Sequence, residues 1–364
     1  MTLTDPALTH LHLAQFRSWP RLTLDLDARP VAIFGANGSG KTNILEAVSM
    51  LSPGRGLRGA PAPEQARQGI EAGWRIRARI GAQQVETAAP PGQGRGVQVD
   101  DKPAPQVALG RLLRVIWLVP AMDRLWTDAP ETRRRFLDRL SLSLIPDHAE
   151  LSLTYDKAMR ERNRLLRDQV SDAGWYRALE AQMAEAGATL TRNRLSAIAA
   201  IMAAQQAAAT SFPAAVLTLL PGEGFADDAD PASIAERLAG MRGRDLAAGR
   251  SLSGPHRADL GAHWGPQDMP AALSSTGEQK ALLLSLILAN ARALSDQPVA
   301  LLLDEVAAHL DSDRRAALYA EIAALPAQTL LTGTGPELFD AFGPAARRLS
   351  IVKEEGASRA EEIA

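Results

Sequence analysis

Alternating hydrophobic and polar positions predict strands in the first part of the chain. Residues 11–19 and 21–27 alternate apolar with polar side chains, as half-buried strands do. Residues 31–34 (VAIF) form a short apolar run that leads into a glycine-rich loop. Residues 42–51 then carry apolar side chains at helical spacing. The pattern therefore predicts strand, glycine-rich loop and helix in direct succession.

The middle of the chain has helical periodicity. From about residue 130 to about residue 210, apolar residues recur at spacings of three and four, with a break at Pro146 and Asp147. Two apolar stripes follow this break, which predicts a pair of antiparallel helices. Residues 212–231 are expected to form a strand and then a loop.

After residue 250 the alternation of strands and helices returns. Residues 272–294 predict a loop and a buried helix, residues 298–311 a strand that ends in two acids, and residues 328–334 another strand. The last residues, EEGASRAEEIA, are expected to form a mobile polar tail. The whole pattern favours an α/β fold with a helical insertion.

The glycine-rich loop matches a phosphate-binding motif. Residues 35–42 read GANGSGKT, which fits G-x-x-x-x-G-K-[ST] between a predicted strand and a predicted helix. Backbone N–H groups at the start of such a helix bind phosphate, Lys41 adds a charge, and Thr42 offers a hydroxyl to Mg²⁺. The predicted nucleotide-binding residues are Gly35, Ala36, Asn37, Gly38, Ser39, Gly40, Lys41, Thr42 and Asn43.

Two adjacent acids provide the expected partner of this loop. The apolar strand ALLLDE (300–305) brings Asp304 to the carboxyl end of a sheet, where open α/β sheets bind ligands. Asp304 is expected to hold Mg²⁺, and Glu305 to polarise an attacking water. Acids at a strand end can also be no more than solvated termini, but together with the phosphate loop they favour nucleotide hydrolysis.

A second anion site is predicted at SSTGEQK (274–280). A Ser-x-Gly before a helix N-terminus can bind an anion, although a serine that caps the helix is the usual explanation. One chain does not need two phosphate-binding helix ends for one nucleotide. Two chains that share two nucleotides head to tail would need both.

Composition restricts the environment and the partners. The chain has 40 Lys and Arg, 42 Asp and Glu, and no cysteine, so disulfides and thiolate metal sites are excluded. This fits the cytoplasm, and the sequence indicates neither a secretion signal nor a membrane span. Because the net charge is −2, a nucleic acid would have to bind to a local basic surface.

Several motifs together resemble a known family. Over about residues 11–335, this chain resembles the SMC-like branch of the ABC-type ATPases. Within that branch it is similar to the RecF family of bacterial recombination mediators. The motifs that carry the resemblance are FRSW (16–19), IFGANGSGKTNILEAV (33–48), PGRGLRG (53–59), RRRFLDRL (133–140), SGPHRADL (253–260), SSTGEQK (274–280) and LLLDEVAAHLD (301–311).

The resemblance implies an ATPase head built from both ends of the chain. The head would comprise residues 1–125 and 241–364, with a helical arm inserted at 126–240. ATP and Mg²⁺ would join two heads in a homodimer, and slow, DNA-stimulated hydrolysis, with Lys41 and Glu305 as catalytic residues, would reset it. At the shared site the resemblance implies Ser275, Gly277 and Glu278 from the partner chain, with Asp311 at the dimer seam. It also implies a phosphate contact of Arg17, which could instead form an ion pair at a strand end.

The family also implies DNA as a ligand. RecF-like proteins mark gaps where single-stranded DNA meets duplex, so that RecR and RecO load RecA. With aromatic residues at only 4%, contacts to the DNA backbone are expected, and Trp117, Trp126 and Trp175 are expected to pack inside the protein. The candidate DNA-binding residues, which could also be solvated surface charges, are Arg55, Arg58, Arg160, Arg164 and Arg167.

Some positions depart from the ABC pattern and leave alternatives open. No Gln follows the strand VIWLVP (115–120), and no switch His follows residues 328–334, where Thr334 is a possible replacement. A small-molecule kinase would need an acceptor pocket and would leave SSTGEQK without a role. A transporter subunit would carry the missing Gln. A structural SMC-like tether would need a longer arm than about 80 residues, at roughly 1.5 Å per helical residue.

Overall fold

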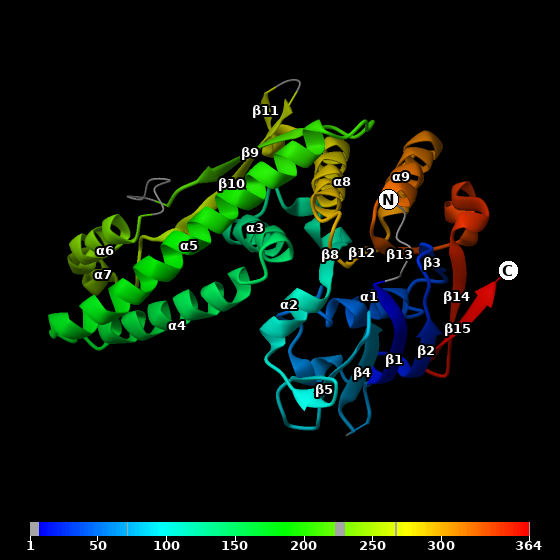
Figure 1. Cartoon of the computed structure of the whole chain (residues 1–364), viewed down its shortest axis with the longest axis horizontal. Helices are drawn as coiled ribbons and strands as arrows, with labels where there is room; N and C mark the ends of the chain where they lie inside the picture. The colour runs from blue at the N-terminus through cyan, green and yellow to red at the C-terminus, as the bar shows by residue number, and fades with distance from the viewer. Residues whose placement is uncertain (1–6, 71, 223–229, 266–267, 364) are drawn as a thin grey trace. The chain divides into compact units, whose positions relative to one another are not determined.

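The computed structural model describes residues 7–70, 72–222, 230–265 and 268–363 (Figure 1). The chain forms two compact units. The first unit comprises residues 1–123, 209–211 and 287–364, and the second comprises residues 124–208 and 212–286. The stretch 241–286, predicted to belong to the C-terminal part of the head, thus clusters with the helical residues of the second unit.

The first unit contains an antiparallel sheet with strand order β2-β1-β4-β5-β6-β7. Strand β4 (WRIRARI) buries every second side chain and exposes the arginines between them, as its alternating sequence requires. The strands predicted at 11–19 and 21–27 are confirmed as β1 and β2, although both begin and end earlier in the chain than predicted. The bounds are β1 Leu8–Phe16, β2 Trp19–Asp25, β4 Trp74–Ile80, β5 Gln83–Ala89, β6 Gly96–Val99 and β7 Lys102–Pro103.

A second sheet of the first unit is mainly parallel, with strand order β15-β14-β3-β13-β12-β8. Strands β3 and β12 read as continuous apolar runs, and β13 (QTLLTG) is buried along its whole length although it carries polar side chains, because both faces of a parallel sheet are covered. Loops at the carboxyl ends of β3, β13 and β12 therefore lie on one edge. The bounds are β3 Val31–Phe34, β8 Arg114–Leu118, β12 Val299–Leu303, β13 Gln328–Gly333, β14 Arg347–Glu354 and β15 Ala357–Ile363.

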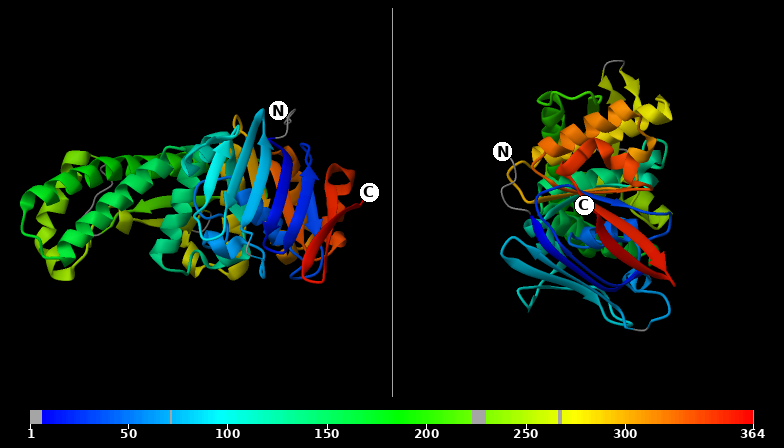
Figure 2. Two further views of the ribbon diagram at one scale, coloured as in Figure 1. Left: turned by 90° about the horizontal axis from the view of Figure 1, so that it is seen from below. Right: turned by 90° about the vertical axis from the view of Figure 1, so that its right-hand side faces the viewer.

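One hydrophobic core joins the two sheets of the first unit. Helix α1 (Lys41–Ser49) contributes Ile44, Leu45 and Val48 to a cluster that also contains side chains from both sheets. The views in Figure 2 show the antiparallel strands as a separate layer from the parallel sheet. Helix α1 is thus held by the core along its buried face, which fixes the direction of its N-terminus. The unit also contains α2 (Leu109–Leu112) and α9 (Ser312–Ala324).

The prediction of a mobile tail at the end of the chain is wrong. Residues of EEGASRAEEIA form β15, which pairs antiparallel with β14 over seven residue pairs. The polar composition reflects an edge strand with exposed side chains, and only Ser358 of this strand is fully buried. Composition alone does not distinguish such a strand from a disordered end.

The second unit is built on a pair of long helices, α4 (His148–Arg167) and α5 (Ala173–Gln206), which pack side by side (Figure 1). This confirms the predicted antiparallel pair. The carboxylate of Asp172 caps α5 by accepting a hydrogen bond from Gly174 N at 2.6 Å. No helix of the described residues is both long and apolar enough to cross a membrane. The other helices are α3 (Pro130–Leu144), α6 (Pro231–Gly240) and α7 (Arg242–Ala248).

A small antiparallel sheet completes the second unit. The sheet has the order β11-β10-β9, with β9 at Ala215–Leu220, β10 at Asp259–Trp264 and β11 at Met269–Pro270. This confirms the strand predicted within residues 212–231; residues 223–229 lie outside the described part. Helix α8 (Thr276–Ala293) begins in this unit and ends in the first.

Candidate nucleotide site

The phosphate loop has the backbone geometry that its glycines predict. Gly35, directly after β3, has φ of 151°, and a Cβ there would collide with the carbonyl oxygen of Ile351. Gly40 precedes α1 with φ of 110° in the left-handed region. No side chain of the described residues caps the N-terminus of α1. Its first N–H groups can therefore bind an anion, as in other phosphate loops.

Two serines from distant parts of the chain, Ser18 and Ser358, hydrogen-bond to this loop and to each other. Ser358 Oγ on β15 donates to Ser39 O at 2.5 Å and lies 2.7 Å from Ser18 Oγ. Ser18 Oγ in turn accepts a hydrogen bond from Asn43 Nδ2 at 2.8 Å. A Cβ on Gly40 would collide with both serine hydroxyls. The loop thus packs closely against both strand ends, and glycine is required at position 40.

Lys41 is positioned within the loop. Its ammonium group donates to Gly35 O at 2.8 Å and to Ala36 O at 3.1 Å. Burial lowers the pKa of Lys41, while the negative charges of Glu305 and Asp304 raise it. The Lys41 ammonium therefore lies near the carboxylates of Asp304 and Glu305 at the same sheet edge. A terminal phosphate bound there could contact the ammonium and a cation held by the carboxylates.

Asp304 and Thr42 come together from opposite ends of the chain. Thr42 Oγ1 donates to Asp304 Oδ1 at 2.8 Å, and Thr332 Oγ1 on β13 donates to the same oxygen at 2.7 Å. A hydroxyl and a carboxylate are the hard oxygen ligands that Mg²⁺ prefers, and Mg²⁺ often takes its other ligands from water and phosphate. Since the described residues contain no cluster of three or more acids and histidines, this pair fits a nucleotide-bound Mg²⁺ and not an all-protein site.

Glu305 follows Asp304 in an unusual backbone conformation. Its φ is 53°, which is uncommon for a residue with a side chain. The backbone N–H of Glu305 donates to Thr332 Oγ1 at 2.9 Å. Thr332 was not predicted; Thr334, which was proposed to replace the switch His, is exposed. The pattern TGT pointed to the right loop but not to the residue that contacts the acids.

Arg17 and Arg58 share one buried acid. Glu46 on α1 is fully buried and accepts from Arg17 Nη2 at 2.6 Å, from Arg17 Nε at 2.9 Å and from Arg58 Nη1 at 2.8 Å. Arg58 also donates to Asn43 Oδ1 at 2.8 Å. The role of Glu46 was not predicted from the sequence. The only sign of it was an acidic residue among the apolar residues of the predicted helix 42–51. Arg17 therefore makes the alternative ion pair, and its contact to phosphate stays a prediction.

The signature segment forms a helix cap in the second unit. Ser275 donates its N–H and its hydroxyl to Glu278 Oε2, both at 2.8 Å, and Glu278 N donates to Ser275 Oγ at 3.3 Å. This is a reciprocal capping box at the start of α8. A Cβ on Gly277 would meet nothing within 4 Å. Because alanine would favour the helix by about 1 kcal/mol, the fold of this chain alone does not explain the glycine.

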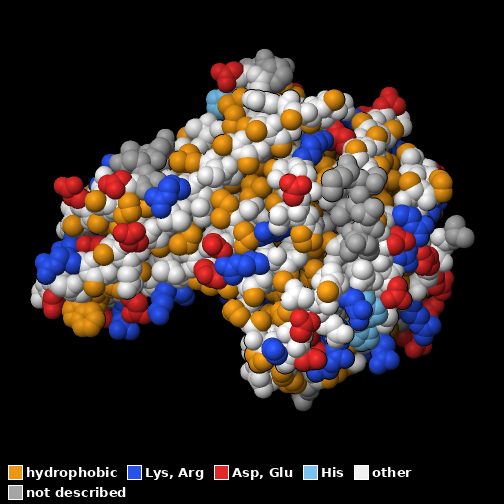
Figure 3. Space-filling view, viewed as in Figure 1, with side chains coloured by type: hydrophobic (Ala, Val, Ile, Leu, Met, Phe, Trp, Pro, Cys, Tyr) orange, Lys and Arg blue, Asp and Glu red, His pale blue; other side chains and the backbone are white. Residues whose placement is uncertain are grey.

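The candidate DNA-binding arginines are exposed. Arg160, Arg164 and Arg167 share one face of α4, and Arg55 lies in the loop after α1. On the face drawn in Figure 3, basic and acidic side chains of the described residues are interspersed, so any DNA contact there would use individual arginines.

Asp311, predicted at the dimer seam, caps helix α9 by accepting a hydrogen bond from Arg314 N at 2.8 Å.

The motifs RRRFLD and GPHRAD bind to each other within the second unit. Arg133 forms an ion pair with Asp259 at 2.6 Å, and Arg134 donates to Ala258 O at 3.0 Å. Asp138 pairs with Arg194 at 2.7 Å, and Arg194 donates to Pro255 O at 2.7 Å. The two motifs thus hold α3 and α5 against the segment before β10, which gives them a structural role.

His256 of this segment should make the protein sensitive to mild acid. Its Nδ1 accepts from the Tyr155 hydroxyl at 2.8 Å, and its Nε2 donates to Ser251 O at 3.3 Å. Burial lowers the pKa of His256 to about 4; Arg257 and Arg134 lower it further, whereas the Ser251 carbonyl and Asp245 raise it. Between about pH 6.5 and pH 4 the unfolded chain binds a proton that the native chain does not, so stability falls as the pH falls.

Between about pH 6.5 and pH 4, protonation of His256 in the unfolded chain is expected to lower the free energy of unfolding by about 3 kcal/mol. Urea unfolding of the wild type and of His256→Gln, measured from pH 7.5 to pH 4.5, checks this. The variant should lose much of the pH dependence. An unchanged slope in the variant would assign the acid sensitivity to other groups.

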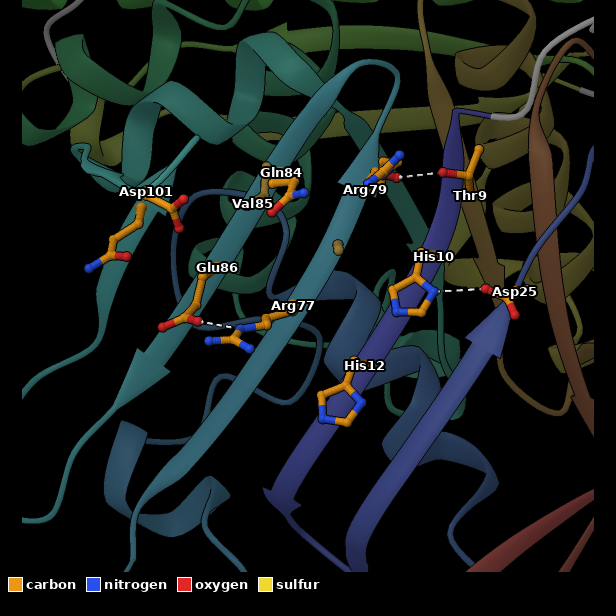
Figure 4. A pocket seen from close by; sticks show the side chains of 12 residues that line it. Thr9, His10, His12, Asp25, Arg77, Arg79, Gln84, Val85, Glu86 and Asp101 are labelled. Atoms are coloured by element: carbon orange, nitrogen blue, oxygen red, sulfur yellow. Dashed lines mark hydrogen bonds and ion pairs between the residues drawn. The ribbon is translucent and has the colours of Figure 1, made fainter.

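A hollow of about 750 Å³ lies on the outer face of the antiparallel sheet (Figure 4). Two pairs of the side chains that line it join neighbouring strands, with Arg77 2.6 Å from Glu86 and His10 2.8 Å from Asp25. None of the residues that line it belongs to the phosphate loop. This hollow therefore resembles a solvated sheet face and not the acceptor pocket of a kinase.

One described tryptophan contradicts its expected packing. Trp117 and Trp126 are buried, as predicted, but the side chain of Trp175 near the start of α5 is 63% exposed. The prediction for Trp175 was wrong because the first turn of α5 extends to solvent.

Known proteins resemble this chain along its whole length. A family model described as "AAA domain" matches residues 10–66. "DNA replication and repair protein RecF" of Mesorhizobium japonicum is 43% identical over 95% of this chain and 97% of that protein. The protein of the same name from Caulobacter sp. strain K31 is 45% identical over 99% of this chain and 100% of that protein.

Solved structures show the same fold. The structure described as "recombination mediator protein RecF-ATPrS in RecFOR pathway" superposes with a TM-score of 0.83 at 20% identity and covers 100% of both chains. The Smc head domain of Pyrococcus furiosus has a TM-score of 0.57 at 17% identity, over 99% of this chain and 96% of that chain. The fold is thus that of an SMC-like, ABC-type ATPase head with an inserted helical arm, and the chain belongs to the RecF family.

Proposed function

We propose that this protein binds ATP with Mg²⁺ and hydrolyses it slowly to control its association with DNA. The contact that carries this proposal is the hydrogen bond between Thr42 and Asp304, which joins the phosphate loop to the acidic strand end. This pair provides oxygen ligands for a cation beside the open N-terminus of α1.

The residues around this pair have separate roles in hydrolysis. Lys41 and the N–H groups of α1 bind the terminal phosphates and stabilise the charge that spreads over them in the transition state. Thr42 and Asp304 would hold Mg²⁺, which would supply positive charge to the phosphates. Glu305 orients the attacking water and accepts its proton. Water is the proposed acceptor of the terminal phosphoryl group.

We propose that the ATP site is completed by a second copy of the chain. Ser275 and Gly277 start a helix whose exposed hydroxyl, N–H groups and bare glycine fit a γ-phosphate. In such a homodimer each nucleotide would lie between the phosphate loop of one protomer and this signature of its partner, with Asp311 at the seam. ATP would close the dimer, and hydrolysis would open it.

The biological task follows from the family. Its members carry the name DNA replication and repair protein, and a solved relative is described as a recombination mediator of the RecFOR pathway. The protein would bind gapped DNA through backbone contacts of Arg55, Arg160, Arg164 and Arg167. With RecR and RecO it would then promote the loading of RecA in the cytoplasm.

Steady-state ATP turnover, measured against protein concentration, tests this proposal. The assay is run without DNA and with single-stranded, duplex and gapped DNA. Turnover per chain should rise with protein concentration, since two chains complete one site, and should rise further with gapped DNA. A turnover that is independent of concentration and of every DNA would indicate a monomeric P-loop enzyme.

Ser275→Arg should separate nucleotide binding from dimer formation. The larger side chain would block the shared site, so the variant should bind ATP as a monomer but fail to dimerise. Light scattering with ATP measures the dimer, and a fluorescent ATP analogue measures binding. Thr154→Arg, at an exposed position of α4, is the matched control and should dimerise normally. A Ser275→Arg protein that still dimerises would contradict the trans site.

A further inference from the structure

A single buried hydroxyl contacts both acids of the strand end. The side chain of Thr332 on β13 is 1% exposed. It donates to Asp304 Oδ1 at 2.7 Å and accepts the backbone N–H of Glu305 at 2.9 Å. The same hydroxyl therefore fixes the carboxylate of one acid and the backbone of the next.

The sheet topology places this threonine between the two halves of the site. β13 lies between β3 and β12 and runs parallel to both. Leu303 pairs with Leu331, so Thr332 stands one residue further along, level with Asp304. A residue at this register can reach the acidic strand end while its own strand supports the strand of the phosphate loop.

The hydrogen bonds leave one oxygen of Asp304 for a cation. Thr42 and Thr332 both donate to Oδ1, so neither of them occupies Oδ2. An aspartate with one oxygen held by two hydroxyls has a fixed rotamer and presents its other oxygen to a metal ion or to a metal-bound water. Partners that orient a metal ligand in this way typically contribute 10- to 100-fold to affinity or activity, as an order of magnitude.

Thr332 also stabilises the conformation of Glu305. A positive φ is unfavourable for a residue with a side chain and persists where surrounding contacts determine it. The bond from Glu305 N to Thr332 Oγ1 is such a contact. If it is lost, Glu305 can relax to an ordinary backbone conformation, and its carboxylate moves away from the position that the strand end gives it.

We propose that Thr332 is a positioning residue for ATP hydrolysis, which orients Asp304 for Mg²⁺ and holds Glu305 in place for the attacking water. This inference rests on the proposed hydrolytic function. It assigns to the loop after β13 a residue that acts through the two acids and that needs only its hydroxyl group.

The test replaces the hydroxyl without changing the shape of the side chain. Thr332→Val should lower kcat by about 10- to 100-fold and, in an equilibrium titration without turnover, raise the Mg²⁺ concentration that gives half-maximal binding of a fluorescent ATP analogue. The KM for ATP should change by less than about threefold, because Lys41 and the helix N-terminus still bind the phosphates. Thr332→Ser keeps the hydroxyl and should recover most of the wild-type turnover.

Thr329→Val is the matched control on the same strand. Thr329 is equally buried, and its hydroxyl bonds to Ala327 O at 3.3 Å, away from the acids. It should leave kcat and the Mg²⁺ dependence unchanged. If Thr332→Val turned over ATP like the wild type, or if Thr332→Ser were as impaired as Thr332→Val, the positioning role would be overturned. A wild-type protein without ATP turnover would instead overturn the proposed function itself.

Discussion

Replacing Glu305 with glutamine should lower ATP turnover at least about 100-fold while ATP still binds. Glutamine has the same shape and keeps the backbone N–H that donates to Thr332, but it cannot accept the proton of the attacking water. Lys41, Thr42 and Asp304 remain in place, so the nucleotide and its cation should stay bound. The ATP-bound dimer should therefore accumulate.

Turnover, binding of a fluorescent ATP analogue and light scattering together check this expectation. Lys41→Met should instead lose nucleotide binding, because the ammonium between the Gly35 and Ala36 carbonyls is removed. Glu337→Gln, at an exposed position after β13, is the control for removing one negative charge nearby. If Glu305→Gln hydrolysed ATP at the wild-type rate, another group would have to act as the base.

Arg162→Met should destabilise the helical unit by about 3–5 kcal/mol. Arg162 is fully buried on α4 and pairs with Asp245 at 2.7 Å and with Glu180 at 3.1 Å. Its Nη1 also donates to Ser251 Oγ at 2.7 Å. Methionine fills similar space but leaves Asp245 without its cation in an apolar interior, and Glu180 with only Arg242. Uncompensated buried charge, not lost volume, is the expected cause.

Urea unfolding followed by circular dichroism measures this loss. Arg160→Met changes an exposed arginine two residues earlier on α4 and should shift stability by no more than about 0.5 kcal/mol. Equal stability of the two variants would mean that the buried cluster contributes little. Because the phosphate loop and Asp304 lie in the first unit, the ATP affinity of the monomer should differ little between the two variants.

The phosphate loop and the acidic strand were predictable because each is a local pattern. A glycine-rich turn between an apolar strand and a helix determines its own geometry, and an apolar run determines where Asp304 and Glu305 leave the sheet. The antiparallel helices were predictable for the same reason, since their apolar stripes are continuous. In these segments the neighbours along the chain decide the structure.

Thr332, Glu46 and Ser358 were missed because their roles depend on partners far away in the sequence. Thr332 resembles any threonine of an apolar strand until β12 is placed beside it. Glu46 needs Arg17 and Arg58, and Ser358 contacts Ser39 across 319 residues. The last strand was mistaken for a tail because its side chains suit solvent, whereas its backbone pairing with β14 cannot be seen in composition.

The contact between Ser358 and the phosphate loop has a consequence for synthesis of the protein. The loop is among the first segments to leave the ribosome, but β12, β13 and β15, which support it, are made only after the whole helical insertion. At about 5–20 residues per second, the 319 residues between Ser39 and Ser358 take tens of seconds to translate. During that interval the nascent chain carries a complete nucleotide-binding motif that cannot yet be a nucleotide-binding site, and interrupted translation products would be unable to trap ATP.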